Sequence, residues 1–350
     1  LHLLSRRQRQ MCIRDRLQLL LGGSGSGKTT LLYQRIRARA EKGEKSILLV
    51  PEQFTSSTEG RIYRELGDAL SGMVESFSFT SLAEKILSTE GGAAVQTLSD
   101  AGRAVLVRRA LEELQDNVHY YHRHRRSAAF CQMAAQTIDE LKSAGLSGQQ
   151  LAQLAGACGA ESGKLSELAL IFQGYETLLA RSGMDPSDRL ELAGARLEEA
   201  LARHSLPEFL RDRAVFIDEF DTFNAPKKRL LGAMLAALPS VTVALCDDGA
   251  PLLPGDLSLF SGAKQVAAQL RQLARKNGAE VAVPQLLRKD LRHRNAPGLA
   301  AVAELLETGS CTADAPAGEV RLFAAPSRGE KLRAAALSLI HISEPTRLGM

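Results

Sequence analysis

The chain has 350 residues, of which 45% are hydrophobic and 24% are charged, and its formal net charge is +4 at pH 7. This composition is typical of a folded globular protein with one or two domains, and it excludes a disordered or fibrous chain. No apolar run approaches the ~18 residues of a membrane-spanning helix, and no apolar segment near the N-terminus indicates a secretory signal. We therefore expect a cytoplasmic protein that does not contact a membrane.

The two ends of the chain differ in character from the rest. Residues 1–16 hold five arginines and one aspartate, a net charge of +4, so the remaining residues sum to about zero. The isoelectric point near 8.8 therefore does not indicate a nucleic-acid partner. Residues 1–16 and 338–350 resemble translated sequencing-adapter sequence, and we expect both segments to be non-native.

The cysteines and histidines predict no metal site and no disulfide framework. The five cysteines are widely spaced and form no C-x-x-C pair, and the seven histidines do not cluster with them. This pattern suits a reducing compartment.

The first part of the chain, residues 17–98, alternates between strand and helix patterns. Short apolar runs predict strands at 17–21, 46–50 and 73–79. Helical spacing of apolar residues predicts helices at 31–40, 61–70 and 80–87. We assign these residues to the first part of an α/β domain.

Residues 99–211 have a different character, because segments rich in Ala, Leu, Glu and Arg follow one another with few β-branched residues. Their spacing predicts helices at 99–115, 127–144, 147–156, 163–182 and 188–203. We interpret this region as an all-helical insertion within the α/β domain.

Sheet patterns return in residues 212–312, which we assign to the second part of the α/β domain. Strands are predicted at 214–217, 241–245 and 280–283, and helices at 227–238, 263–277 and 298–308. Alternation of apolar strands with helices favours a parallel sheet covered on both faces. Residues 313–337 are expected to form a linker and then, with a strand at 319–324, the start of a truncated second domain.

The most informative motif directly follows the first predicted strand. It fits the phosphate-binding pattern G-x-x-x-x-G-K-[ST] at every fixed position. In such a loop the glycines turn backbone N–H groups toward phosphate oxygens, and the following helix adds the positive end of its dipole. Lys28 would reach the β- and γ-phosphates and Thr29 would be a ligand of Mg²⁺. The predicted ATP-binding residues are Gly22, Gly23, Ser24, Gly25, Ser26, Gly27, Lys28, Thr29 and Thr30.

A second acidic motif completes the predicted site. The apolar strand 214–217 leads directly into Asp218 and Glu219. At the carboxyl edge of a parallel sheet, Asp218 would hold Mg²⁺ and Glu219 would polarise the attacking water, with Lys28 as the third catalytic residue. An acidic turn after a strand is also common without any such role.

Three further patterns admit two interpretations each. Asp247 and Asp248 follow the strand 241–245 and either sense the γ-phosphate or lie in a solvated loop. Arg292 and Arg294 either reach a phosphate or are ordinary surface cations. Residues 119–126, HYYHRHRR, have the composition of a single-strand nucleic-acid groove, although a solvated junction between two helices is the preferred interpretation.

Taken together, several segments resemble the N-terminal part of AddB proteins, the B subunits of bacterial AddAB helicase–nucleases. The resemblance covers about 17–332 and is carried by GGSGSGKT, ILLVPEQFT, VESFSFTSLAEKIL, KLSELALIFQGYETLL and VFIDEFDTF.

The resemblance implies a P-loop domain of superfamily 1 helicase type and a subunit that processes double-strand DNA ends for recombinational repair. It implies ATP and Mg²⁺ as cofactors, an AddA-type helicase–nuclease subunit as partner in a heterodimer, and contacts to a DNA strand by Phe54 and Thr55. The family's nuclease domain and iron–sulfur cluster are expected only in a C-terminal region that this sequence does not include.

Two alternatives stay open from the sequence. The chain could belong to a regulatory or scaffold subunit that binds ATP and DNA without motor activity. A stand-alone P-loop kinase for a small molecule is disfavoured by the long helical insertion.

Overall fold

The structure, a computed structural model, describes residues 15–92, 94, 96–114, 116–159, 162–310, 324–333 and 335. The chain divides into two compact units, Leu1–Lys289 and Asp290–Met350. The first unit holds the sheet and most of the helices, and it is described first. Among the described residues, no helix combines the length and the apolar character needed to cross a bilayer.

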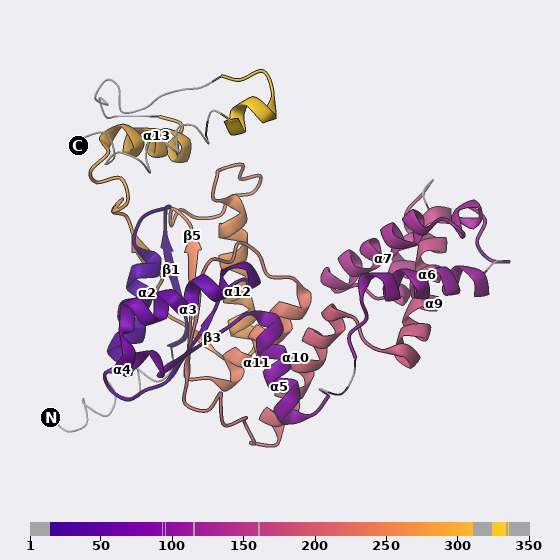
Figure 1. Ribbon diagram of the computed structural model, residues 1–350, viewed down its shortest axis with the longest axis horizontal. Helices are drawn as coiled ribbons and strands as arrows, with labels where there is room; N and C mark the ends of the chain where they lie inside the picture. Colours follow the sequence, from indigo (N-terminus) through magenta and orange to yellow (C-terminus); the bar gives the residue numbers. More distant parts are fainter. Residues whose placement is uncertain are drawn as a thin grey trace, which may run out of the picture. The chain divides into compact units, whose positions relative to one another are not determined.

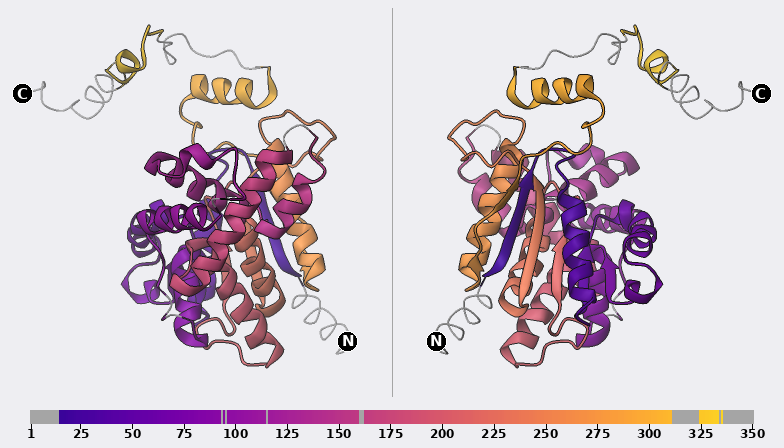
Figure 2. Two further views of the ribbon diagram at one scale, coloured as in Figure 1. Left: turned by 90° about the vertical axis from the view of Figure 1, so that its right-hand side faces the viewer. Right: turned by 90° about the vertical axis from the view of Figure 1, so that its left-hand side faces the viewer.

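Seven parallel strands form the sheet of the first unit (Figure 1). The order across the sheet is β3-β2-β4-β5-β1-β6, and β7 also pairs with β1. Figure 2 shows β1 and β5 running side by side, in the register Leu17 opposite Val241. The bounds are β1 (Asp15–Gly22), β2 (Ser46–Leu49), β3 (Val74–Phe77), β4 (Ala214–Ile217), β5 (Ser240–Cys246), β6 (Glu280–Val281) and β7 (Gln285–Leu287).

Helices cover both faces of the sheet, which explains why its inner strands are apolar throughout. All four residues of β2 and all four of β4 are buried. Alternate residues belong to different cores: Leu19 packs in one and Leu20 in the other. One face is covered by α2 (Lys28–Ala40) and α3 (Thr55–Leu66), and the other by α5 (Phe79–Glu90), α10 (Pro186–Ala202), α11 (Ala225–Ala237) and α12 (Ser261–Lys276).

Between α5 and β4 the chain forms a run of helices with a hydrophobic core of its own. The core joins residues of α6 (Asp100–Glu113), α7 (Ala128–Ser143), α8 (Gly148–Ala155) and α9 (Ser162–Ser182), among them the fully buried Phe172. The next helix, α10, packs instead against α5 and α11 in the core of the sheet. The helical segment with its own core is therefore α6–α9.

A buried polar network joins this helical segment to α10. Asp185, which is 1% exposed, accepts hydrogen bonds from the Tyr175 hydroxyl at 2.6 Å and from Lys142 Nζ at 2.8 Å. Lys142 also forms an ion pair with Asp188 at 2.8 Å. Burial opposes the charge on Lys142, but its hydrogen bonds to the two aspartates outweigh burial and raise its pKa.

Some element boundaries differ from the sequence-based expectation. The helix predicted at 61–70 was wrong in its bounds, because α3 starts at Thr55, directly after a 3-10 turn, η1 (Glu52–Phe54). Helix α3 ends at Leu66 and is followed by Gly67, whose φ of 75° only glycine adopts readily, and then by α4 (Asp68–Ser71). Strand β7 was not predicted, and α2 begins at Lys28 rather than at residue 31.

In the second unit the described helix of more than two turns is α13 (Pro297–Thr308), which ends at Gly309 in the left-handed conformation. The linker and strand predicted between 313 and 324 fall almost entirely on residues 311–323, outside the described part of the chain, as does 338–350. The predicted domain boundaries stay predictions.

Candidate nucleotide site

The loop between β1 and α2 is shaped by two glycines in the left-handed conformation. Gly25 has φ 79° and Gly27 has φ 89°, values at which a side chain would be strained. Gly27 directly precedes α2, whose N-terminus has no side-chain cap and no acidic residue in its first turn. Its N–H groups and the positive end of its dipole therefore favour an anion at the loop.

Lys28 folds back across this loop. Its Nζ donates hydrogen bonds to the carbonyl oxygens of Gly22 and Gly23, both at 2.8 Å. The ammonium group therefore lies where the loop leaves the sheet, and its positive charge partly opposes the burial that raises the pKa of the Asp218 carboxyl group. The structure thus brings Lys28 and Asp218, predicted from segments far apart in sequence, into one site.

The loop is tightly packed at Gly22 and has an unsatisfied hydroxyl inside it. A Cβ atom on Gly22 would lie 2.4 Å from Ser26 Oγ and 2.6 Å from the carbonyl oxygen of Leu287, so only glycine fits. Ser26 is 7% exposed, and its Oγ has no hydrogen-bond partner. A buried hydroxyl without a partner costs ~1–3 kcal/mol, and an anion bound in the loop would accept its hydrogen bond. The loop therefore fits a phosphate group.

Asp218 lies at the carboxyl end of β4 and is 7% exposed. Burial is the main influence on its carboxyl group and raises its pKa, although a hydrogen bond with the Thr29 side chain opposes this effect. The two residues predicted to hold Mg²⁺ are therefore in contact, across the intervening strand β5. Mg²⁺ takes oxygen ligands and retains several waters, so one hydroxyl and one carboxylate form a suitable pair.

Glu219 is exposed and adopts φ 63°, a left-handed conformation that costs a residue with a side chain ~1–2 kcal/mol. Its N–H donates to Asp218 Oδ1 at 3.0 Å, which fixes the direction of the turn. After the turn, Phe220 and Phe223 pack against Phe79 with ring centroids 5.2 and 6.0 Å away. Buried aromatic rings thus hold the strained residue at the edge of the sheet.

Asp247 and Asp248 adopt different environments at the end of β5. Asp247 is 3% exposed, its N–H donates to Gly22 O at 3.2 Å, and burial raises its carboxyl pKa. Its Oδ1 accepts from the N–H of Gly249 at 2.7 Å. Asp248 instead forms an ion pair with Lys264 at 3.2 Å. Asp247 is therefore not part of a solvated loop, and it buttresses the end of β1.

Phe54 and Thr55 lie at the same sheet edge, after β2. Phe54 is 39% exposed, and the Thr55 hydroxyl donates to the carbonyl oxygen of Glu52 at 2.9 Å. Glu52 was not predicted as a site residue. Burial opposes its charge, but hydrogen bonds from its own backbone and from the Thr80 side chain, helped by the charge of Lys227, lower its pKa.

Tyr33 was also missed by the sequence analysis. Burial raises its pKa to about 12, the charge of Asp218 adds to this rise, and Arg61, 4.8 Å from the ring centroid, opposes it. Tyr33 follows Thr29 by four residues on α2, and residues four apart share one helix face. That spacing could have marked it as a neighbour of the site.

The remaining candidates lie elsewhere in the chain. Arg292 and Arg294 belong to the second unit, and their suggested role at a phosphate stays a prediction. Residues 119–126 belong to the helical segment α6–α9.

Comparison with known proteins agrees with the resemblance found in the sequence. The profile of the family described as "ADDB, N-terminal" matches residues 19–303. A protein of Desulforudis audaxviator, named as the B subunit of an ATP-dependent helicase/deoxyribonuclease, is 33% identical over 340 residues, covering 93% of this chain and 28% of its own length. Proteins with the same name from Moorella thermoacetica and Symbiobacterium thermophilum are both 31% identical, covering 95% and 93% of this chain and 30% and 29% of their own lengths.

The chain thus spans less than a third of the curated relatives it matches. The family profile covers well over half of the chain, including the loop at Lys28 and the acidic turn at Asp218. The chain therefore belongs to the family of AddB N-terminal regions.

Proposed function

We propose that this chain is the ATP-binding part of a DNA helicase–nuclease subunit that processes double-strand DNA ends for recombinational repair. The observation that carries the proposal is the contact of Thr29 with Asp218 beside the glycine loop. This arrangement, on a parallel sheet, supports a P-loop NTPase fold of superfamily 1 helicase type. In this proposal residues 17–98 and 212–312 form the nucleotide domain and residues 99–211 are inserted into it.

Each residue of the site has one task in this proposal. Gly22–Gly27 and Thr30 surround the phosphates with backbone N–H groups, and Lys28 exchanges its two carbonyl partners for β- and γ-phosphate oxygens. Thr29 and Asp218 would hold Mg²⁺, which offsets phosphate charge when bound. Glu219, exposed and fixed in direction by its strained backbone, orients the attacking water.

The DNA and partner assignments rest on the names of the relatives. Those proteins are named as subunits of a helicase/deoxyribonuclease, and we propose that this chain likewise pairs with an AddA-type subunit and acts on duplex ends and the single strands they yield. Phe54, exposed at the sheet edge, and Thr55 are proposed to contact the DNA strand. An iron–sulfur cluster is proposed only for the part of the protein beyond this chain.

The test of ATP binding compares Lys28→Ala with Lys42→Ala, a matched exposed lysine just beyond α2. Binding of a fluorescent ATP analogue with Mg²⁺ is followed by anisotropy. We expect Lys28→Ala to weaken binding at least about tenfold, the loss expected for a hydrogen bond to a charged group, and Lys42→Ala to leave it unchanged. Affinity retained within about twofold by Lys28→Ala would remove the central claim.

A second measurement separates a motor from a binding subunit. The Lys28→Ala substitution is placed in the full subunit paired with its AddA-type partner, and unwinding and degradation of a duplex end are measured. Loss of either activity supports a motor role for this site. Normal unwinding and degradation, together with lost ATP binding, would instead assign the site to regulation or scaffolding.

A further inference from the structure

The turn that joins α6 to α7 gathers aromatic and cationic side chains. Between Asp116 and Asp139 the sequence contains three arginines and three histidines and no carboxylate. All six of these side chains lie within 119–126, which includes the 3-10 turn η2 (His122–His124). The composition of this turn is unusual in a chain with only 5% aromatic residues.

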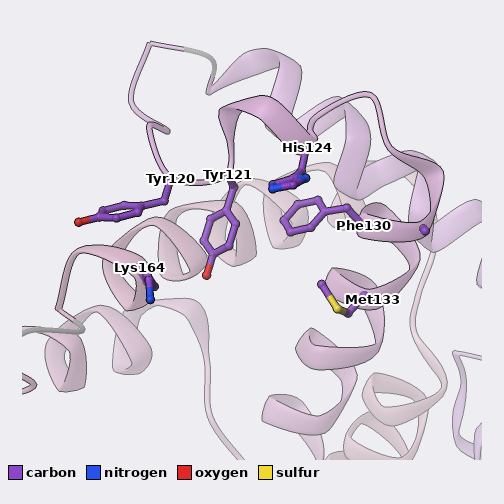
Figure 3. A pocket seen from close by; sticks show the side chains of 7 residues that line it. Tyr120, Tyr121, His124, Phe130, Met133 and Lys164 are labelled. Atoms are coloured by element: carbon purple, nitrogen blue, oxygen red, sulfur yellow. The ribbon is translucent and has the colours of Figure 1, made fainter.

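A hollow of about 420 Å³ opens between this turn, α7 and the start of α9 (Figure 3). Its volume falls in the range of ~300–1,000 Å³ typical of sites for small ligands or ligand fragments. The rings of Tyr121 and His124 both stack on Phe130, with centroids 5.3 and 5.5 Å apart and planes within 30°. The lining residues are Tyr120, Tyr121, His124, Ala129, Phe130, Met133 and Lys164.

Much of this apolar lining is exposed. Tyr120 is 57% exposed and Met133 is 56% exposed. Burying either side chain in the core of the helical segment would stabilise the fold, so their exposure is a feature to explain. Figure 3 shows Tyr120 and Lys164 on one side of the hollow, and His124, Phe130 and Met133 on the other. The hollow therefore presents the flat ring of Tyr120 and the side chain of Met133 to the outside.

A buried carboxylate on α9 fixes the backbone of the turn. Glu167, 6% exposed on α9, accepts hydrogen bonds from the N–H groups of His119 at 2.7 Å, Tyr120 at 2.9 Å and Tyr121 at 3.3 Å. The Tyr120 ring lies across Gly163, where a Cβ atom would be 2.9 Å from Tyr120 Cε2. The two tyrosines are thus positioned before any ligand binds, which lowers the entropic cost of binding.

The electrostatic surroundings favour an anion. Arg123 and Arg126 are exposed on the turn, and α7 starts beside the hollow with no acidic residue in its first turn. On α6, Glu112 and Glu113 each pair with an arginine of the same helix, at 3.1 and 3.2 Å, and Asp116 is exposed between α6 and the turn. Glu167 is buried beneath the turn and is compensated by its three N–H donors.

We propose that this hollow binds single-stranded DNA, with one unpaired base stacked on the Tyr120–Tyr121 side and the flanking phosphates held by Arg123 and Arg126. Aromatic faces with adjacent cations are the combination that binds single strands, because every base offers a flat face. A duplex does not fit this role, since its bases are stacked on one another. The inference rests on the proposed function for the choice of DNA as the nucleic acid.

The test uses the full chain and a 12-nucleotide oligothymidylate carrying one 2-aminopurine, whose fluorescence falls when the base stacks on an aromatic ring. The variants are Tyr120→Ala and Tyr120→Phe, with Tyr63→Ala as a matched control, because Tyr63 is 56% exposed on α3. We expect Tyr120→Ala to weaken binding at least about fivefold, the lower end for loss of one base–aromatic stack, and to abolish quenching. Tyr120→Phe keeps the flat ring and Tyr63→Ala lies outside the hollow, so both should bind as the parent chain does.

Three outcomes would overturn the proposal. Unchanged affinity and quenching in Tyr120→Ala would show that the hollow does not hold a base. Equal affinity of the parent chain for the oligothymidylate and for a 12-base-pair duplex would show non-specific binding by charge. Normal oligonucleotide binding by Tyr120→Ala, with weakened assembly with the AddA-type subunit, would assign the hollow to a protein partner.

The same variants separate this inference from the proposed function. Lys28→Ala should lose ATP binding and keep oligonucleotide binding, whereas Tyr120→Ala should do the reverse. Circular dichroism and urea unfolding of each variant show whether the fold is intact, and Tyr120→Phe repeats the comparison with the smallest change in packing.

Discussion

Gly22 offers a sharp test of how the glycine loop is built, because the substitution Gly22→Ala adds a single methyl group. That methyl group would lie 2.6 Å from the carbonyl oxygen of Leu287, well inside the 3.4 Å at which ordinary contact begins. The neighbour is the backbone of β7, which pairs with β1 at this point, so it cannot rotate away as a side chain would. Either β7 or the loop must shift.

The expected cost follows from this crowding. Inserting an extra methyl group into a well-packed site typically costs ~1–3 kcal/mol. For comparison, Gly60→Ala places the same methyl group in the middle of α3, where nothing lies within 4 Å. An alanine inside a helix stabilises it by ~0.5–1 kcal/mol relative to glycine. The two substitutions should therefore change the free energy of unfolding in opposite directions.

Urea unfolding followed by circular dichroism measures both effects. Each variant replaces glycine by alanine, so each removes similar conformational freedom from the unfolded chain, and the difference between them isolates the contact. We expect Gly22→Ala to unfold at lower urea than the parent chain and Gly60→Ala at slightly higher urea. We also expect Gly22→Ala to lose affinity for the ATP analogue, because Gly22 O anchors both Lys28 Nζ and the N–H of Asp247.

A parent-like midpoint for Gly22→Ala would refute this reasoning, since it would mean that the loop and β7 are not packed as described. A loss of stability with unchanged nucleotide affinity would refute the expected link between the packing of Gly22 and nucleotide binding. In that case the position of Gly22 O would not matter for the loop.

Three further predictions concern other parts of the molecule. Burial raises the pKa of Asp218, so this carboxyl group binds a proton in the folded state at pH values where the unfolded chain has released it. Its contribution to the free energy of unfolding therefore falls as the pH rises from about 4, the pKa in the unfolded chain, through the pKa in the folded state. Urea unfolding should therefore show Asp218→Asn gaining stability relative to the parent as pH rises through this window, while Mg²⁺-dependent ATP binding is lost; a parent-like pH dependence would contradict this. Asp185→Ala leaves Lys142 with Asp188 as its remaining ion-pair partner and the buried Tyr175 hydroxyl without its acceptor, which should cost ~1–3 kcal/mol in urea unfolding; a cost under about 0.5 kcal/mol would contradict it. Phe54→Ala, at a half-exposed side chain, should leave the urea midpoint within about 0.5 kcal/mol of the parent but weaken DNA binding by the paired subunits, and unchanged DNA binding would count against its proposed role.

Much of the fold could be predicted because the patterns that mark a strand or a helix, apolar runs and capping residues, lie within a few residues of one another in the sequence. The strand at Ala214–Ile217 was predicted with its observed bounds. Four consecutive apolar residues followed by Asp218 are too few for a buried helix and are typical of a short buried strand. The five helices between residues 99 and 203 were also predicted to within two residues at each end, because serine caps or a proline at the first turn mark most of their starts.

What the sequence could not predict depends on contacts between distant segments. The strand Gln285–Leu287 is short and has no apolar alternation, and it exists because β1 offers a free edge on which it can pair. The contact of Thr29 with Asp218 depends on the order of strands in the sheet, which places β5 between β1 and β4. The roles of the site residues stay predictions, to be tested by the variants above.

The strand order also has a consequence for how the chain acquires its structure during synthesis. Leu17 pairs with Val241, and Leu21 with Leu286, so β1, which is the first strand of this sheet in chain order, waits for β5 and β7 to be synthesised. At ~5–20 residues per second this wait is on the order of ten seconds or more. The segment α6–α9 has a core that needs no later residue, so it can fold first. The glycine loop is therefore encoded early and completed late, and a nascent chain arrested before β5 should hold folded helices together with an unpaired, aggregation-prone β1.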